Sequence, residues 1–148
     1  MANQSRNAVI TALITYLDTN IAAIKGFEDG PIPVTSATDS DFPLLIVAER
    51  GETLIDRFTT ASREINLSLD LSLYYNSSDT TEAVARGISD DLVKYCEQAA
   101  KTRLPDSDGT ETCLNISANN ETTVHNVQDS GLHQRIRSVD IVIEQEFA

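Results

Sequence analysis

EINLSLDLSLYY, residues 64–75, places an apolar side chain at every second position from Ile65 to Tyr75. Polar side chains occupy the alternate positions from Glu64 to Ser72. Because successive side chains of a strand point to opposite faces, this alternation predicts one long β-strand with an apolar face and a polar face. The polar face carries Glu64 and Asp70 and no converging catalytic groups. We therefore expect it to form a subunit contact or the wall of a lumen rather than an active site.

Length and charge bound the class of protein. The 148 residues, of which 41% are hydrophobic, fit one domain, 1–148, that can bury its own core. The net charge of −12 repels polyanions, which disfavours a protein that reads or wraps nucleic acid. No apolar run approaches the roughly 20 residues of a membrane span, and no secretory signal pattern opens the chain. We therefore expect a cytoplasmic chain without a membrane segment.

Residues 4–24 predict a first helix, because apolar side chains recur there at spacings of three and four. These side chains are Ile10, Leu13, Ile14, Leu17, Ile21 and Ile24. Gly26 follows as a stop. Residues 27–41 hold two prolines and many small polar residues, which predicts a long connection with a short extended piece at 32–34.

Residues 81–102 predict a second helix, with Asp79 or Thr80 as its N-cap. Its apolar stripe consists of Val84, Ile88, Leu92, Tyr95, Cys96 and Ala99. Gly87 interrupts this stripe, where a glycine costs about 1 kcal/mol of helix stability relative to alanine. We expect Gly87 to mark a close approach of the helix to the sheet.

Before the long strand, residues 42–49 form an apolar run suited to a buried strand. Pro43 fits best at the first residue of that strand, where the missing N–H costs least. Residues 50–52 are a turn candidate because they contain glycine between charged residues. Residues 53–62 carry only a weak pattern.

After the second helix, residues 113–118 and 122–127 alternate between apolar and polar, with a turn expected at 119–120. Residues 135–147 form the last strand. The order is therefore helix, strands, helix, strands. This order predicts an α+β fold in which two amphipathic helices pack on one face of a mostly antiparallel sheet.

Few residues suggest chemistry. Cys96 and Cys113 lack metal-ligand spacing, so we expect buried free thiols, with a disulfide or a reactive thiol as alternatives. His125 and His133 lie eight residues apart without a neighbouring ligand motif, so ordinary surface residues are favoured over a metal pair. Residues 106–111 resemble part of a calcium loop but precede a β pattern, which favours a polar turn. We predict no catalytic, cofactor or metal residues.

A small group of arginines stands out in this acidic chain: Arg57, Arg63, Arg135 and Arg137. Solvated surface charges are the default interpretation. The alternative is that these arginines form salt bridges between subunits or touch a phosphate backbone. Together with Glu64 and Asp70 from the long strand, they are our candidate contacts with other subunits or partners.

The order of elements resembles the tail terminator (tail-completion) proteins of long-tailed bacteriophages and of phage-derived tail machines. The likeness spans the chain and is carried mainly by residues 42–47, 63–75 and 84–99. It rests on pattern rather than on a signature motif. It implies a structural protein of the virion, assembled in the host cytoplasm, with no enzymatic activity and no cofactor.

The resemblance further implies a ring, usually a hexamer, that caps the tail tube, stops its polymerisation and offers a surface to the head or neck. Its partners would be copies of itself, the tail tube protein and a neck or head-completion protein. DNA would pass through the lumen without sequence-specific binding, and an acidic lumen wall would let it slide.

Two other classes remain open. One is another neck or head-completion protein, or a small cytoplasmic adaptor that binds a protein partner. The other is an enzyme, for instance a hydrolase that uses His125 or His133 with nearby carboxylates.

Overall fold

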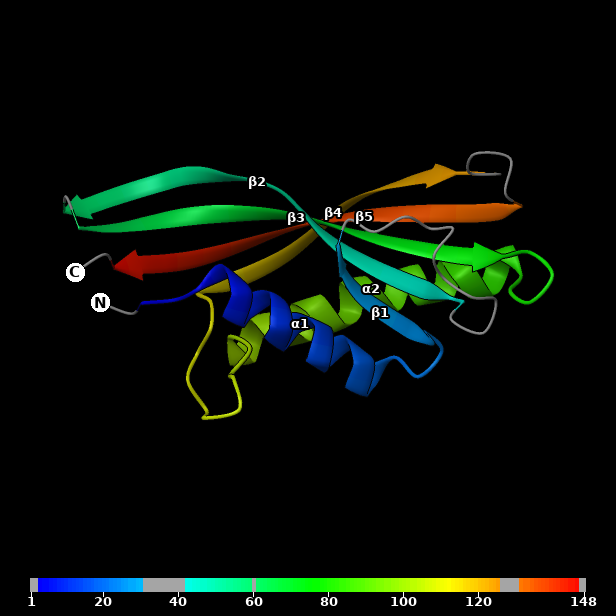
Figure 1. Ribbon diagram of the computed structural model, residues 1–148, viewed down its shortest axis with the longest axis horizontal. Coiled ribbons are helices and arrows are strands. Elements are labelled where there is room, and N and C mark those ends of the chain that lie inside the picture. The colour runs from blue at the N-terminus through cyan, green and yellow to red at the C-terminus, as the bar shows by residue number, and fades with distance from the viewer. Residues whose placement is uncertain (1–2, 31–41, 60, 126–130, 147–148) are drawn as a thin grey trace.

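The computed structural model describes residues 3–30, 42–59, 61–125 and 131–146 and has an α+β fold, as predicted (Figure 1). Two helices lie on one face of a five-stranded sheet with the order β1-β2-β3-β5-β4. Neighbouring strands are antiparallel except for the parallel pair β1 and β2. In chain order the elements are α1 (Arg6–Asn20), β1 (Gly26–Gly30), β2 (Leu44–Thr59), β3 (Ser62–Asn76), α2 (Glu82–Thr102), β4 (Asn115–Val124) and β5 (Leu132–Glu146).

The long alternating strand is β3, at the centre of the sheet. Its register with β5 runs from Ser62↔Glu146 to Asn76↔Leu132 without a shift. Its apolar side chains all face the helices and are at most 1% exposed: Ile65, Leu67, Leu69, Leu71, Leu73 and Tyr75. The predicted strand and its buried face are therefore confirmed.

The helices begin at hydroxyl caps. The side chain of Ser5 accepts a hydrogen bond from the Ala8 N–H, which starts α1. The side chain of Thr81 accepts one from the Val84 N–H, so the cap of α2 is Thr81 and not Asp79 or Thr80. One stripe position was also wrong, since Val84 is 52% exposed and Ala85 is buried in its place.

Several predicted turns are continuous strand. Residues 50–52 lie within β2, which also includes most of the weakly patterned segment after them. Pairing with the regular strand β3 extends β2 through this unfavourable sequence, an override of local preference by tertiary context. Residues 119–120 likewise lie in β4, where a register shift accommodates them.

Two further differences concern the first half of the chain. The short strand β1 was not predicted, and it pairs with the start of β2 from Gly26↔Leu44 to Gly30↔Ala48. Helix α1 ends at Asn20, four residues early, although Ile21 and Ile24 remain buried beyond it. The extended piece predicted at 32–34 lies outside the described residues.

The sheet is longer than the helices that cover it. At about 3.3 Å per residue, β2 and β3 each extend over about 50 Å. At 1.5 Å per residue, α1 extends over only about 22 Å and α2 over about 31 Å. Figure 1 shows the consequence, since the β2–β3 hairpin projects past both helices at one end of the molecule.

The face of the sheet away from the helices is partly apolar. A second buried cluster there joins Phe42, Leu44, Ile46 and Leu132, with Tyr74 packed against it. The register places Leu44 opposite Tyr74, on the face that the polar side chains of β3 share. This face is therefore apolar at one end and polar along the rest of β3.

Gly87 does not mark a close approach of α2 to the sheet. It is exposed, and a Cβ atom built on it would meet nothing within 4 Å. We expect Gly87→Ala to raise the free energy of unfolding by about 1 kcal/mol, because alanine removes the entropic penalty of glycine inside a helix. Urea unfolding followed by circular dichroism measures the change.

The matched control is Gly109→Ala. Gly109 has φ +82, a conformation that strains any L side chain, so this substitution should lower stability. A destabilised Gly87→Ala variant would contradict the open position of residue 87.

Candidate functional site

The most unusual surface is the outer half of β2. The strand is buried from Leu44 to Val47, but every residue from Glu49 to Phe58 is exposed. Strand β1 covers the outer edge of β2 only as far as Ala48. Beyond that point the outer edge has no strand partner among the described residues.

Three apolar side chains lie on this projecting half-strand. Leu54, Ile55 and Phe58 are 47%, 49% and 43% exposed, and we call them the tip patch. All three lie within one short exposed segment of β2, and exposed apolar surface gathered in one place can mark a contact surface. The tip patch is therefore the first candidate functional site.

Three register shifts between β2 and β3 shape this surface. They leave Arg50, Ile55 and Phe58 without a directly opposed residue on β3. Such bulges twist a strand and re-aim its side chains, and they make an edge a poor template for another strand. The tip patch is therefore suited to packing by side chains rather than to extension of the sheet.

Ion pairs fix the hairpin to the body of the domain. Arg6, in the first turn of α1, lies 2.9 Å from Glu49 and 3.6 Å from Glu52. Arg63 lies 3.3 Å from Glu52 and also donates to the side chain of Gln145 on β5. The Arg6 contacts tie the middle of β2 to α1, and the Arg63 contacts tie the start of β3 to β2 and β5, while Leu54, Ile55 and Phe58 stay exposed.

The structure brings three of the six candidate contact residues together near the tip. Arg57 lies opposite Arg63, and Glu64 lies opposite Asp56. Asp70 lies farther along β3, where its carboxylate accepts a hydrogen bond from Arg50 at 3.3 Å. A partner role for these residues stays a prediction.

The other two candidates, Arg135 and Arg137, lie on the opposite half of the sheet and face α2. Arg135 is 7% exposed and lies 2.9 Å from Glu82 and 2.7 Å from Glu121. Arg137 lies 3.3 Å from Glu121 and donates to the Ser89 hydroxyl at 3.0 Å. These charges join α2, β4 and β5 within one chain.

Hydrogen bonds change the proton affinity of groups in this network. The bonds from Tyr75 and Arg135 lower the pKa of Glu82. Burial raises the pKa of Tyr75, and its bond to Glu82 raises it further. Glu82 is therefore ionised at neutral pH while Tyr75 keeps its proton.

Glu121 compensates two largely buried arginines, so its charge should matter for stability. We expect Glu121→Gln to cost about 2–3 kcal/mol, because Arg135 and Arg137 would lose a shared carboxylate. Urea unfolding at neutral pH measures the loss.

Glu111→Gln is the control, since its pair with Arg103 is about half exposed on both sides. That substitution should cost less than about 1 kcal/mol. Equal effects of the two substitutions would show that the network does not depend on the Glu121 charge.

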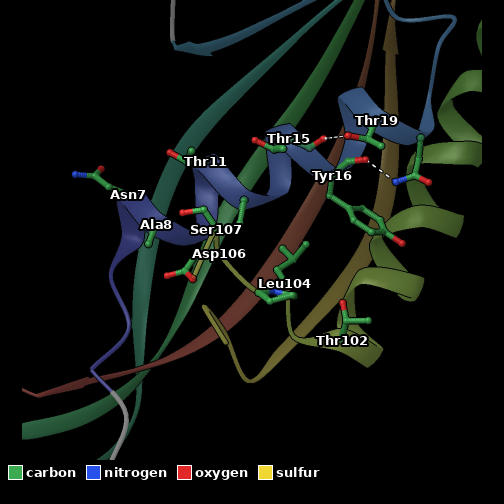
Figure 2. Close-up of a pocket in the computed structure, with 13 residues that line it drawn as sticks. Asn7, Ala8, Thr11, Thr15, Tyr16, Thr19, Thr102, Leu104, Asp106 and Ser107 are labelled. Atoms are coloured by element: carbon green, nitrogen blue, oxygen red, sulfur yellow. Dashed lines mark hydrogen bonds between the residues drawn. The ribbon is translucent and has the colours of Figure 1, made fainter. Parts of the chain in front are cut away.

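A second surface is a groove between the outer side of α1 and the loop that follows α2 (Figure 2). Leu104 and Pro105 contribute apolar surface, and the α1 side is lined with alanines, threonines and asparagines together with Tyr16. Thr19 donates to the Thr15 carbonyl, so its hydroxyl is engaged within the helix. The Asn20 amide likewise donates to the Tyr16 carbonyl, and the Asp106 carboxylate accepts within its own turn. The lining residues include no acid–base pair.

The two cysteines and the acidic turn lie where the sequence predicts them. Cys96 and Cys113 are buried free thiols, as predicted, and burial raises their pKa to about 12 and about 11. Both thiols are therefore protonated and unreactive near neutral pH. The polar turn at 106–111 is also confirmed, because the Asp106 carboxylate accepts hydrogen bonds from the N–H groups of Asp108 and Thr110.

His125 and His133 are brought together, with their Nδ1 atoms 3.2 Å apart. Eight residues separate them in sequence, but the hairpin of β4 and β5 places them side by side.

None of the described helices is both long enough and apolar enough to cross a bilayer.

Comparison with known proteins gives one kind of likeness. No protein-family model matches the sequence, and no curated protein matches it. Among solved structures, the fold is similar to a chain in the virion of a native gene transfer agent particle, with a TM-score of 0.62. The chain shares its fold with a virion component. The two sequences are 11% identical, and the match covers 93% of this chain and 96% of the other.

Proposed function

We propose that this chain is a structural protein of a phage-like virion. More specifically, we propose that it assembles into a ring that caps the tail tube and stops its growth. The resemblance of the sequence to tail terminator proteins suggests a hexamer. The same ring would offer the attachment surface for the head or neck. One observation carries the proposal: the β2–β3 hairpin projects past both helices (Figure 1), and the tip patch on it is exposed to solvent.

The energetics of the tip patch fit assembly on a template. Complete burial of a leucine, isoleucine or phenylalanine side chain contributes about 1.5–3 kcal/mol, and each of these three is already about half buried. One tip contact therefore supplies only a few kcal/mol. Association of two free proteins costs about 4–15 kcal/mol, so an isolated pair would be weak. Ring closure, or binding to an existing tube, adds the contacts that make the assembly stable.

The shape of the hairpin also favours a ring. A ring requires head-to-tail contacts between two different surfaces of each subunit. The tip patch would supply one of these surfaces. The hairpin that carries it reaches past the two helices (Figure 1), where a neighbouring subunit could meet it. The twisted, bulged edge of β2 discourages open-ended strand addition, which would give fibres instead of closed rings.

Charge and chemistry support a mechanical role. The net charge of −12 would let DNA pass a ring lumen without sticking, because like charges repel. The two surfaces described above, the tip patch and the groove on α1, offer packing contacts rather than a reactive group. The likeness to a chain of a virion particle agrees with such a role.

The test compares charged substitutions at the tip with one elsewhere. Native mass spectrometry and negative-stain imaging, with and without tail tubes, report the assembly state. We expect the parent chain to form a closed ring, alone or at tube ends. Leu54→Asp and Phe58→Asp should abolish the ring, because burial of a charge at the contact is costly.

Val84→Asp is the matched control, since Val84 is 52% exposed, slightly more than the two tip residues, but lies on α2. It should assemble like the parent chain, and circular dichroism should show that all variants are folded. Normal rings from both tip variants would contradict the assigned contact. A stable monomer that binds no tube would contradict the ring itself, and capping of a neck assembly instead would point to a neck or head-completion protein.

A further inference from the structure

The two histidines form a cross-strand pair at the far end of the sheet. Val124↔Gln134 is the last paired position of β4 and β5. His125 directly follows β4, and His133 is the next residue of β5 at that end. Their ring centroids lie 5.1 Å apart and their planes are inclined by 70°. Their Nδ1 atoms approach to 3.2 Å, which places two good metal ligands beside each other.

A carboxylate completes the group. The Oε1 atom of Glu82, the first residue of α2, lies 3.9 Å from the Nδ1 atom of His125. One potential ligand atom from each of the three residues lies within 4.8 Å of the others. His125 is exposed, so an ion from solvent could reach the group directly.

We propose that His125, His133 and Glu82 bind one divalent transition-metal ion of the zinc type. Zinc bonds to imidazole nitrogen at about 2.0–2.1 Å, so two nitrogens in a tetrahedral shell are about 3.3 Å apart. The observed separation of 3.2 Å matches this value. A small movement of the Glu82 carboxylate supplies the third ligand, and water fills the fourth position. Imidazole nitrogens favour zinc, nickel or copper over magnesium and calcium, which prefer oxygen ligands.

The surroundings already orient these ligands. The Glu82 carboxylate accepts a hydrogen bond from the Tyr75 hydroxyl at 2.8 Å and one from Arg135 at 2.9 Å. The ring of His133 lies against the ring of Tyr75, with centroids 5.4 Å apart. Outer partners of this kind hold metal ligands in place and are important for affinity. A shared N–H···N hydrogen bond between the two imidazoles is the metal-free alternative.

A bound ion would join the end of the β4–β5 hairpin to the start of α2. These elements lie at the end of the molecule opposite the β2–β3 hairpin (Figure 1). The metal site is thus separate from the tip patch and does not depend on the proposed function.

Isothermal titration calorimetry with zinc chloride tests the site on the full chain, purified without a histidine tag and stripped with a chelator. We expect one ion per chain. Loss of an outer partner typically lowers metal affinity 10–100-fold, so loss of a direct ligand in His125→Ala or His133→Ala should lower it by about 100-fold or more. Glu82→Gln should weaken binding less than either histidine substitution, because an amide oxygen can still coordinate weakly.

Asp90→Asn is the matched control, since Asp90 is exposed on the same helix but outside the group. It should leave zinc affinity unchanged. Cobalt gives a second readout, because a tetrahedral cobalt site absorbs visible light and the band should vanish in both histidine variants. Absence of zinc binding, or binding that survives both histidine substitutions, would overturn the proposal.

Discussion

Packing of the two helices against the apolar face of β3 is the interaction on which the rest of the structure depends. The apolar side chains at every second position of β3, from Ile65 to Tyr75, are at most 1% exposed. Strands β2 and β5 pair with the two edges of β3. The same interaction sets a limit, because helices rise only 1.5 Å per residue whereas strands rise about 3.3 Å. Helices of 15 and 21 residues cannot cover strands of 15 and 16 residues along their whole length. The exposed hairpin follows from this difference in length.

The two ends of the sheet therefore differ in chemistry. At the hairpin end, apolar side chains project into solvent with no helix to cover them. At the other end, α2 continues over the sheet and encloses the charges of Arg135 and Arg137, which carboxylates neutralise within the chain. The hairpin end is therefore suited to contact with other subunits. The opposite end holds the ion pairs that stabilise the chain itself and the proposed metal site.

The sequence predicts those helices and strands in which the spacing of apolar residues reflects one buried face. β3 alternates because one face is buried, and α2 repeats at helical spacing for the same reason. The outer half of β2 escapes prediction because both of its faces are exposed, so no burial pattern marks it. Arg135, Arg137 and the buried Val139 and Ile141 lie at alternate positions of one strand and therefore on the same face. This alternation could have shown that the two arginines face the helices. The histidine pair depends on the register of β4 and β5, which spacing alone does not give.

Hydrogen–deuterium exchange of the amides of residues 49–58, compared between the free chain and the chain bound at tail tube ends, tests the assembly contact most directly. If a neighbouring subunit packs on the tip patch, these amides should exchange markedly more slowly in the assembly, because the contact suppresses local opening and excludes water. The amides beside His125 and His133, at the other end of the sheet, should change little. Unchanged exchange at 49–58, with protection elsewhere on the surface, would contradict the assignment of the projecting hairpin as the contact.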